Sequence, residues 1–424
     1  MLAMLSRAAE IVTAYGRFGW TSEPYDAFLA LEADELPELV FACLNELEDA
    51  PTFFDHALSL IDEVAFAEGI ARAIPAVTDG DGPAVAVIYY ASLQVPQLLA
   101  PHLAALWEPA ARNGVLTIRP WRGADRSERD RLLAELERAE TRRFYSDEHV
   151  GAQRAALALL ESRDESTVRQ VLASSWAPAQ PSAAMDAHIR AVGFDPDGPR
   201  RLAPDGCWHL ALPEALIADR LTGAAHLHPD RHPTWRGLGA PVAHGRLGGR
   251  ADGECGSCGG RLHRLLLLPA VPPGLGVSLA ALEIATCLSC LGWEQPELFY
   301  HHDTAGRPDP LQQATYRIEP EFPAEPLLDG EVGLVPTPDR WRLQNWGAAN
   351  GRENLHRLGG EPTWIQGPDY PRCPACRSAM TALLQLDSDL PTADGGEWLW
   401  GSGGIGYVSW CDTCAISCVQ WQCT

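Results

Sequence analysis

Four Cys-x-x-Cys pairs in the last 170 residues constrain the fold of this chain more than any other feature of its sequence. The chain has 12 cysteines in 424 residues, so random placement would produce only about 0.3 such pairs. Two intervening residues let both sulfurs lie on one tight turn, and two such turns complete a tetrahedral zinc site. We therefore expect two structural Zn²⁺ sites, whose ligands are Cys255, Cys258, Cys287, Cys290, Cys373, Cys376, Cys411 and Cys414.

The spacing of the pairs favours two zinc-ribbon-like sites. Between the first two pairs lie 28 residues, and between the last two lie 34, which suits two turns brought together by a hairpin or sheet. A site shared by the first and third pairs remains an alternative. Four thiolates leave no coordination position for water, so hydrolytic chemistry is not expected, and each site contributes on the order of 10 kcal/mol to folding.

The remaining cysteines have simpler interpretations. Cys418 and Cys423 follow the last pair and could replace one of its ligands, although buried thiols are the simpler interpretation. Cys43 lies on an apolar helix face and Cys207 lies beside Trp208, so both are expected in the core. The start of the chain resembles no signal peptide, and no run of about 18 apolar residues is present. We therefore expect a cytoplasmic protein, where reduced cysteines bind metal rather than form disulfides.

An internal repeat accompanies the cysteine pairs. Arg-Leu-Gly-Gly occurs at residues 246–249 and again at 357–360, each time before a Cys-x-x-Cys pair, an apolar run and a second pair. Pro-Thr-Trp occurs at 233–235, before the first Arg-Leu-Gly-Gly, and at 362–364, after the second. The shared order of landmarks indicates a duplication, with copies near residues 225–300 and 350–424.

The chain divides by composition into a helical part and a β-rich part. Leu36, Leu39 and Val40 recur at helical spacing, and residues 151–174 predict a helical hairpin, although no period repeats three times. The apolar run at residues 85–90 could instead be a strand. After a linker at 177–182, short apolar runs at 265–268, 380–386 and 405–410 predict buried strands.

These patterns predict an α+β protein. Residues 1–185 form an α-helical domain plus linker, with helical-hairpin repeats as one possible arrangement. Residues 186–424 form a duplicated, β-rich, zinc-stapled domain.

The charge of the chain limits the kinds of partner that it can bind. The net charge is −23 and all 33 basic residues are arginine, so the chemistries that need a Walker A, Schiff-base or kinase-type lysine are excluded. A strongly acidic surface repels nucleic acid, whose binding depends on phosphate neutralisation, and suits a basic protein. We expect a basic protein partner and neither nucleic acid nor membrane.

The only dense histidine cluster is His226, His228 and His232. Alternate residues of a strand share a face, so the first two could bind a metal together, but a polar loop before Pro233 explains the cluster equally simply. No catalytic motif occurs in a convincing context, so we expect no catalytic residues and no cofactor other than zinc.

The segment 358–414 carries a family resemblance. It contains LGGEPTWIQ (358–366), CPAC (373–376), ALLQLDSDL (382–390), GSGGIGYVSWC (401–411) and CDTC (411–414). These motifs resemble the bacterial YwqG-like family and the related eukaryotic programmed cell death protein 2 family. The resemblance implies a mainly β, α+β fold with internal duplication. It assigns a structural role to the matching positions Gly359, Gly360, Pro362, Trp364, Cys373, Cys376 and Gln385.

The resemblance also implies a type of function. The eukaryotic branch acts as a chaperone that holds a basic ribosomal protein, and some bacterial members are thought to be immunity or protein-interaction proteins. We therefore expect a zinc-stabilised protein-binding module, chaperone-like or immunity-like, that acts on a basic partner and is not an enzyme. The alternative is a metal- or thiol-dependent enzyme that uses the His226, His228 and His232 region or a redox Cys-x-x-Cys. Nucleic-acid binding through zinc ribbons is the weakest hypothesis.

Overall fold

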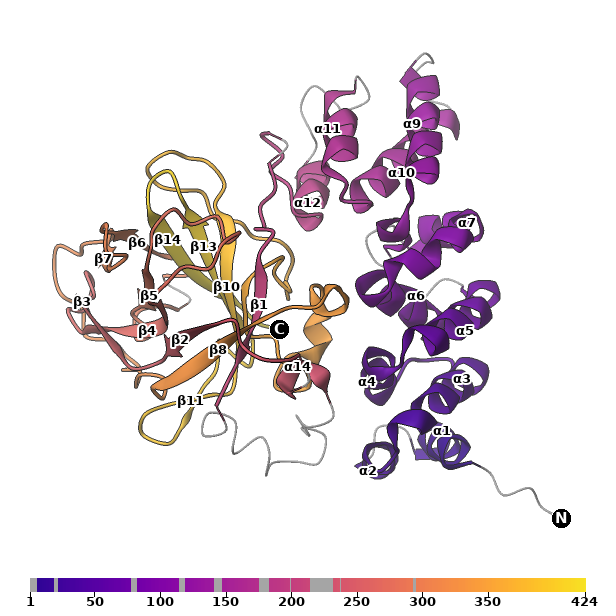
Figure 1. Ribbon diagram of the computed structural model, residues 1–424, viewed down its shortest axis with the longest axis horizontal. Coiled ribbons are helices and arrows are strands. Elements are labelled where there is room, and N and C mark those ends of the chain that lie inside the picture. The colour runs from indigo at the N-terminus through magenta and orange to yellow at the C-terminus, as the bar shows by residue number, and fades with distance from the viewer. Residues whose placement is uncertain are drawn as a thin grey trace. The chain divides into compact units, whose positions relative to one another are not determined.

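A computed structural model of the chain describes residues 6–18, 22–77, 82–113, 119–140, 147–174, 183–198, 200–213, 232–236, 238–292 and 295–424. The chain forms two compact units (Figure 1). Unit 1 comprises Met1–Val192 with Pro196–Pro199, and unit 2 comprises Gly193–Asp195 with Arg200–Thr424. The expected order, a helical N-terminal region followed by a β-rich C-terminal region, is confirmed. The predicted linker at 177–182 lies outside the described residues.

Unit 1 consists of helices that stack in chain order (Figure 1). Helix α1 contacts α2 and α3, while α3 contacts α4 and α5 and α4 contacts α6, so neighbouring helical hairpins pack in two rows. No helix in the described part of the chain is long and apolar enough to cross a membrane. The helices are α1 (Arg7–Phe18), α2 (Ser22–Leu29), α3 (Leu36–Glu46), α4 (Thr52–Leu60), α5 (Glu63–Ala73), α6 (Pro83–Gln94), α7 (Leu103–Asn113), α9 (Arg126–Glu140), α10 (Asp147–Glu161), α11 (Glu165–Ala173) and α12 (Ala183–Ala191).

The apolar run at residues 85–90 is helical, so the strand alternative was wrong. It belongs to α6, which packs against α4 and α5 and buries side chains around most of its circumference. A helix buried on several sides has no polar face, and its sequence therefore looks like that of a buried strand. The hairpin predicted at 151–174 is confirmed: α11 follows α10, and its N-cap is Asp164, whose carboxylate accepts the N–H of Thr167 at 2.9 Å.

In the described part of unit 2, twelve strands form one antiparallel sheet. The strands follow the order β3-β4-β2-β8-β1-β9-β10-β13-β14-β6-β7, and β5 pairs with β4 outside this path. Its hydrophobic core includes Leu266, Leu334, Leu384 and Val408, all nearly inaccessible to solvent. The apolar runs predicted as strands lie in β4, β10 and β13, as expected.

The bounds of these elements complete the description of unit 2. They are β1 (Cys207–Ala211), α14 (Pro233–Arg236), β2 (Ala243–Leu247), β3 (Arg250–Glu254), β4 (Arg261–Leu268), β5 (Leu282–Thr286), β6 (Leu298–His302), β7 (Pro308–Pro310), β8 (Gly330–Pro336), β9 (Arg357–Gly359), β10 (Thr381–Asp387), β13 (Ile405–Cys411) and β14 (Ile416–Gln422), with a separate two-stranded sheet of β11 (Leu390–Pro391) and β12 (Glu397–Trp398).

Two three-stranded blocks of the sheet share one pairing register. In block one, β4 pairs with β2 and β5; in block two, β10 pairs with β9 and β13. In each block, the residue five positions after the second of its four cysteines pairs with the residue just before the third cysteine. These pairs are His263–Thr286 in block one and Thr381–Trp410 in block two. The register then shifts at Leu265 in β4 and at Leu383 in β10, seven residues after that cysteine in both blocks.

The Arg-Leu-Gly-Gly strand occupies the same register in both blocks. Leu247 of β2 faces Leu266, and Leu358 of β9 faces Leu384; both partners are the eighth residue after the second cysteine. The glycine pairs after these leucines all have positive φ angles, between 70° and 77°. Each Arg-Leu-Gly-Gly motif therefore ends its strand with a turn that suits glycine.

The two blocks also exchange a strand. Strand β1 precedes block one in the chain but pairs with β9 of block two, while β8 precedes block two and pairs with β2 of block one. Strands β1 and β8 pair with each other and join the blocks. The exchange makes each block depend on a strand that the chain places before the other block.

The first glycine of each motif supplies a test of this arrangement. A Cβ at Gly248 or Gly359 would lie 2.2 Å from a backbone carbonyl oxygen, that of Leu328 or Gly206 respectively. We expect Gly248→Ala and Gly359→Ala to lower the free energy of unfolding by similar amounts, on the order of 2 kcal/mol or more. Urea unfolding followed by tryptophan fluorescence measures the loss.

Gly395→Ala is the matched control, because Gly395 also has a positive φ angle but open space around its Cβ position. It should cost only the backbone strain, about 1 kcal/mol. Equal losses in all three variants would contradict the close approach of the backbone at the two motifs.

Candidate metal centre

The structure gathers the eight predicted ligands into two groups of four. We call each Cys-x-x-Cys turn a knuckle, and the two groups centre 1 and centre 2. In each centre the four sulfur atoms all lie within 4.8 Å of one another. The knuckles therefore meet within each half of unit 2, and not across the halves. Centre 1 is Cys255, Cys258, Cys287 and Cys290, and centre 2 is Cys373, Cys376, Cys411 and Cys414.

The strand register brings the knuckles together. The first knuckle precedes β4 or β10, and the second follows the antiparallel partner, β5 or β13. Because the partner strand runs back toward the first knuckle, both turns lie at the same end of the strand pair. Each centre therefore closes one end of a two-stranded ladder.

The sulfur geometry fits a tetrahedral metal. Four sulfurs about 2.3 Å from one zinc ion lie about 3.8 Å apart at tetrahedral angles. The Sγ–Sγ distances match this value: 3.8 Å for Cys255–Cys290, 3.7 Å for Cys258–Cys287 and 3.6 Å for Cys376–Cys411. Four soft thiolate donors in this arrangement suit Zn²⁺, and they leave no position for water or substrate on a four-coordinate ion.

The first knuckle has the same backbone in both centres. The residue after its second cysteine is left-handed, with φ 75° at Gly259 and φ 67° at Arg377. Two backbone hydrogen bonds close each turn: Cys255 N–H to Gly260 O (2.7 Å) and Gly259 N–H to Cys255 O (2.8 Å), and likewise Cys373 N–H to Ser378 O (2.9 Å) and Arg377 N–H to Cys373 O (2.8 Å).

Backbone N–H groups of the knuckles also point at the sulfurs. In centre 1 the N–H of Ser257 donates to Cys255 Sγ and that of Gly260 donates to Cys258 Sγ, both at 3.4 Å. Such bonds stabilise the thiolate form and orient the ligand around a metal. In centre 2 the corresponding N–H of Ser378 lowers the pKa of Cys376 to about 6.

Electrostatics explain why four adjacent thiols need a cation. A hydrogen bond from Cys287 lowers the pKa of Cys255 to about 4, so one thiolate forms readily in centre 1. Burial raises the pKa of Cys290 and of Cys411, and neighbouring thiolates raise both further. A divalent cation compensates the accumulated negative charge and releases the remaining protons.

Buried polar groups support centre 1 from behind. The hydroxyl of Tyr300 on β6 accepts the N–H of Cys287 at 3.1 Å and is 3.0 Å from the hydroxyl of Thr286. The ring of His263 on β4 accepts the N–H of Leu288 at 3.1 Å through Nδ1. These contacts fix the second knuckle relative to β4 and β6.

Centre 2 rests on an apolar cluster. Cys373 and Cys411 pack with Met380, Ile416 and Cys418, and Cys376 is exposed. Cys418 is fully buried, burial raises its pKa, and it belongs to neither four-sulfur group. The remaining cysteines outside the two centres, Cys43, Cys207 and Cys423, are also buried.

The histidine cluster is only partly described. His226 and His228 lie outside the described residues. His232 is buried, and burial lowers its pKa to about 3. Its Nδ1 accepts the N–H of Thr234 at 3.3 Å, and its Nε2 lies 3.5 Å from a carboxylate oxygen of Glu353. The neutral ring is therefore held inside unit 2 by neighbouring groups.

Sequence reasoning missed a buried network around the second Arg-Leu-Gly-Gly. Arg357 is 1% exposed and donates to Arg342 O at 2.7 Å and to Thr363 Oγ1 at 2.7 Å. Gln385 Oε1 accepts the N–H of Thr363 at 2.7 Å. At the same register position of block one, Arg246 forms an exposed ion pair with Asp329. Identical motifs gave no signal of this difference.

The residues of block two on which the resemblance rests contact neighbouring side chains and backbone inside unit 2. The indole of Trp364 lies 4.5 Å from the ring of Tyr407 and 5.1 Å from that of Tyr370, measured between ring centroids. Gln385 Nε2 donates to the carbonyl of Leu355 at 2.8 Å. Gly360 has no room for a side chain, because a Cβ would lie 2.5 Å from Cys207 Sγ.

Comparison with known proteins identifies one short similarity. A segment of 69 residues, 16% of this chain, is 35% identical to the uncharacterized protein YpfL of Salmonella typhimurium strain LT2. The segment spans 15% of that protein's length. No protein-family model matches the chain. No solved structure matches it either.

The metal centres predict a defined stoichiometry. Elemental analysis of the purified chain should find two zinc ions per chain, and Cys290→Ser and Cys414→Ser should each lower the content to one. The two centres share no ligand, so the loss of one should leave the other occupied. Cys423→Ser is the control and should keep two. A single substitution that removes both ions would contradict two independent sites.

The left-handed arginine predicts a stabilising substitution. Arg377 is exposed and takes a backbone conformation that costs a non-glycine residue about 1 kcal/mol. We expect Arg377→Gly to raise the free energy of unfolding by about 0.5–1 kcal/mol, because centre 1 uses glycine at the equivalent position. Arg377→Ala keeps the strain and should be neutral. A gain with alanine equal to that with glycine would assign the effect to the side chain instead.

Proposed function

We propose that the chain is a zinc-stabilised protein-binding module, chaperone-like or immunity-like, whose partner is a basic protein. The observation that carries the proposal is the pair of four-sulfur centres, each of which closes the end of a strand pair. All-thiolate sites of this kind stabilise a fold and hold a surface in shape. The net charge of −23 makes a basic protein the complementary partner.

The metal in both centres is zinc under this proposal. Sulfur separations of 3.6–3.8 Å and four thiolate donors support it. When bound, zinc supplies neutralisation of the thiolate charge and free energy of folding. The residues of the knuckles orient the sulfurs, and the N–H of Ser257 stabilises Cys255 as a thiolate.

The proposal includes an origin by duplication. Its support is the shared register of the two blocks, with the same shift at Leu265 and Leu383 and the same placement of both Arg-Leu-Gly-Gly strands. The first knuckles agree as well in their hydrogen bonds and left-handed residue. Independent origins would have to reproduce each of these features separately.

The contacts of two buried side chains, those of His232 and Arg357, fit structural roles. His232 is neutral, enclosed and bonded to its neighbours, and Arg357 is bonded to neutral oxygens. The resemblance of residues 358–414 to the YwqG-like and programmed cell death protein 2 families adds the chaperone-like or immunity-like character to the proposal. We place the protein in the cytoplasm, where thiols stay reduced.

Affinity purification tests the proposed function. The tagged full chain, expressed in its native host, should recover a basic protein, and the recovery should fall between 50 and 500 mM salt because the attraction is electrostatic. Quantitative mass spectrometry measures the recovery. The double variant Cys290→Ser/Cys414→Ser, which lacks both centres, is the control and should lose the partner.

Two results would contradict this function. The protein-binding hypothesis would be wrong if the purification recovered nucleic acid instead of protein. It would also be wrong if no partner were recovered. A third metal ion at a site with an open coordination position would favour the enzyme alternative instead.

A further inference from the structure

An irregular segment between β7 and β8 runs past centre 1. We call residues 311–326 the strap. It contains no helix or strand, and most of its residues are exposed. Loops of this length without regular structure are uncommon in compact domains and often functional.

Hydrogen bonds tie the strap to both knuckles of centre 1. The N–H groups of Ala314 and Ile318 donate to the carbonyls of Gly256 and Ser257 in the first knuckle, at 3.0 and 3.1 Å. The N–H of Ala324 donates to Ser289 Oγ in the second knuckle at 2.8 Å. The strap is therefore held against both knuckles of centre 1.

The strap presents apolar and acidic side chains to solvent. Tyr316 is 82% exposed and Phe322 is 76% exposed, and both belong to the few large apolar residues that are exposed in the described part of the chain. Arg317, Glu319 and Glu321 lie between them in sequence and are exposed as well, and Arg317 forms an ion pair with Glu254 of β3 at 3.4 Å. Exposed aromatic residues are typical anchors of protein interfaces, and the flanking carboxylates select a basic partner.

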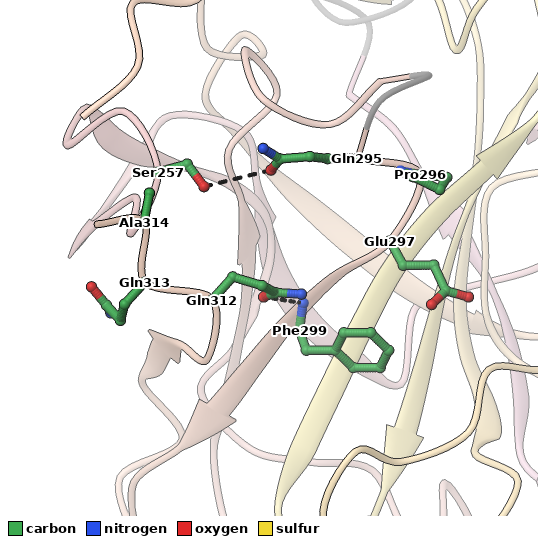
Figure 2. Close-up of a pocket in the computed structure, with 8 residues that line it drawn as sticks. All are labelled: Ser257, Gln295, Pro296, Glu297, Phe299, Gln312, Gln313 and Ala314. Atoms are coloured by element: carbon green, nitrogen blue, oxygen red, sulfur yellow. Dashed lines mark hydrogen bonds between the residues drawn. The ribbon is translucent and has the colours of Figure 1, made fainter. Parts of the chain in front are cut away.

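A pocket of about 510 Å³ opens where the strap meets the first knuckle (Figure 2). Two hydrogen bonds join its walls: Ser257 to Gln295 at 3.5 Å, and the N–H of Phe299 to Gln312 Oε1 at 2.9 Å. Its lining is formed by Ser257, Gln295, Pro296, Glu297, Phe299, Gln312, Gln313 and Ala314. The strap thus supplies part of the lining and centre 1 another part.

Glu297 is the only ionisable residue among those that line the pocket. It is half-buried, and burial together with the charge of Asp369 raises its pKa. No ion pair joins it to an arginine or histidine in the described part of the chain. A carboxylate that is partly desolvated and repelled by a second one gains most from an incoming cation.

We propose that the strap and this pocket form the docking site for an extended, arginine- or lysine-bearing segment of the partner protein. A cationic side chain enters the pocket toward Glu297, and apolar side chains of the same segment lie on Tyr316 and Phe322. The glutamine amides of the lining offer hydrogen bonds to the main chain of the segment. This inference rests on the proposed function and adds to it the place of binding and the chemistry of the bound segment.

The docking site can be tested with a defined peptide. The probe is a fluorescein-labelled nonapeptide of alternating arginine and leucine, and its counterpart carries glutamate in place of arginine. Fluorescence anisotropy with the zinc-loaded full chain should detect binding of the arginine peptide only. Glu297→Gln and the double variant Tyr316→Ala/Phe322→Ala should each weaken its affinity about tenfold.

Two control variants separate docking from general charge attraction. Glu331→Gln removes an exposed carboxylate on β8, and Val242→Ala removes an exposed apolar side chain outside the strap. Both should bind the arginine peptide as the wild type does. Equal losses in the controls, or a change in oligomeric state without a change in peptide affinity, would overturn the inference.

Gly256→Ala tests the coupling of the strap to centre 1. A Cβ at Gly256 would lie 1.9 Å from the carbonyl oxygen of Gln312, so the strap must move away from the knuckle. We expect two zinc ions to remain bound while the peptide affinity falls at least fivefold. Gly198→Ala is the matched control, because Gly198, like Gly256, has no positive φ angle and its Cβ position is open. Unchanged peptide affinity in Gly256→Ala with a displaced strap would overturn the coupling.

The purification from the host separates failure of the docking site from failure of the function. If Tyr316→Ala/Phe322→Ala and Glu297→Gln still recover the basic partner as well as the wild type does, the partner docks elsewhere and only the site is wrong. If the wild type itself recovers no basic protein, the proposed function fails and the docking site fails with it. Loss of the partner in these variants alone, with two zinc ions retained, supports both.

Discussion

In each half of unit 2, four cysteine sulfurs meet where an antiparallel strand pair ends, and the strand register decides whether they can. A slip of one residue moves a strand by about 3.4 Å, close to the separation of neighbouring sulfurs. The shifts at Leu265 and Leu383 are therefore part of the site, because they adjust the ladders that lead to the knuckles. A bound metal would hold the register in return.

Much of the architecture of unit 2 follows from this constraint. Each four-sulfur centre lies in a block of three strands, and the blocks are joined through β1 and β8, which pair with each other and with the opposite blocks. The positive-φ glycines of both Arg-Leu-Gly-Gly motifs let their strands pass within contact of the backbone before β8 and β1. Neither block is a self-contained zinc ribbon, because the neighbouring strand of each comes from the other part of the chain.

The two halves differ at their surfaces. Centre 1 is overlaid by the strap, which requires Gly256, whereas centre 2 has Pro374 at the equivalent place and leaves Cys376 exposed. The arginine of the repeated motif is buried in block two and paired with Asp329 at the surface in block one. One block therefore carries an interior polar network, and the other carries a solvent-facing segment that its metal centre holds in place.

Short-range patterns made parts of this protein predictable. The residue types and spacing of the cysteine pairs predicted the eight cysteines that the structure gathers into two four-sulfur groups, and the apolar runs predicted β4, β10 and β13. The apolar run at residues 85–90 allowed a strand as an alternative, but it forms part of α6. Burial on several sides removes the polar face by which a helix is recognised in sequence. The strap gave no signal, since its exposed aromatic residues look in sequence like the core residues of a short strand.

The sequence by itself determined which sulfurs could share a metal, because two residues between cysteines confine both sulfurs to one turn whatever surrounds it. Only the tertiary structure decided which turns meet, since pairing within or across the halves depends on the register between distant strands. It also decided that Arg357 lies inside, Arg246 outside and the strap on centre 1. These outcomes depend on long-range packing, about which a local sequence motif carries no information.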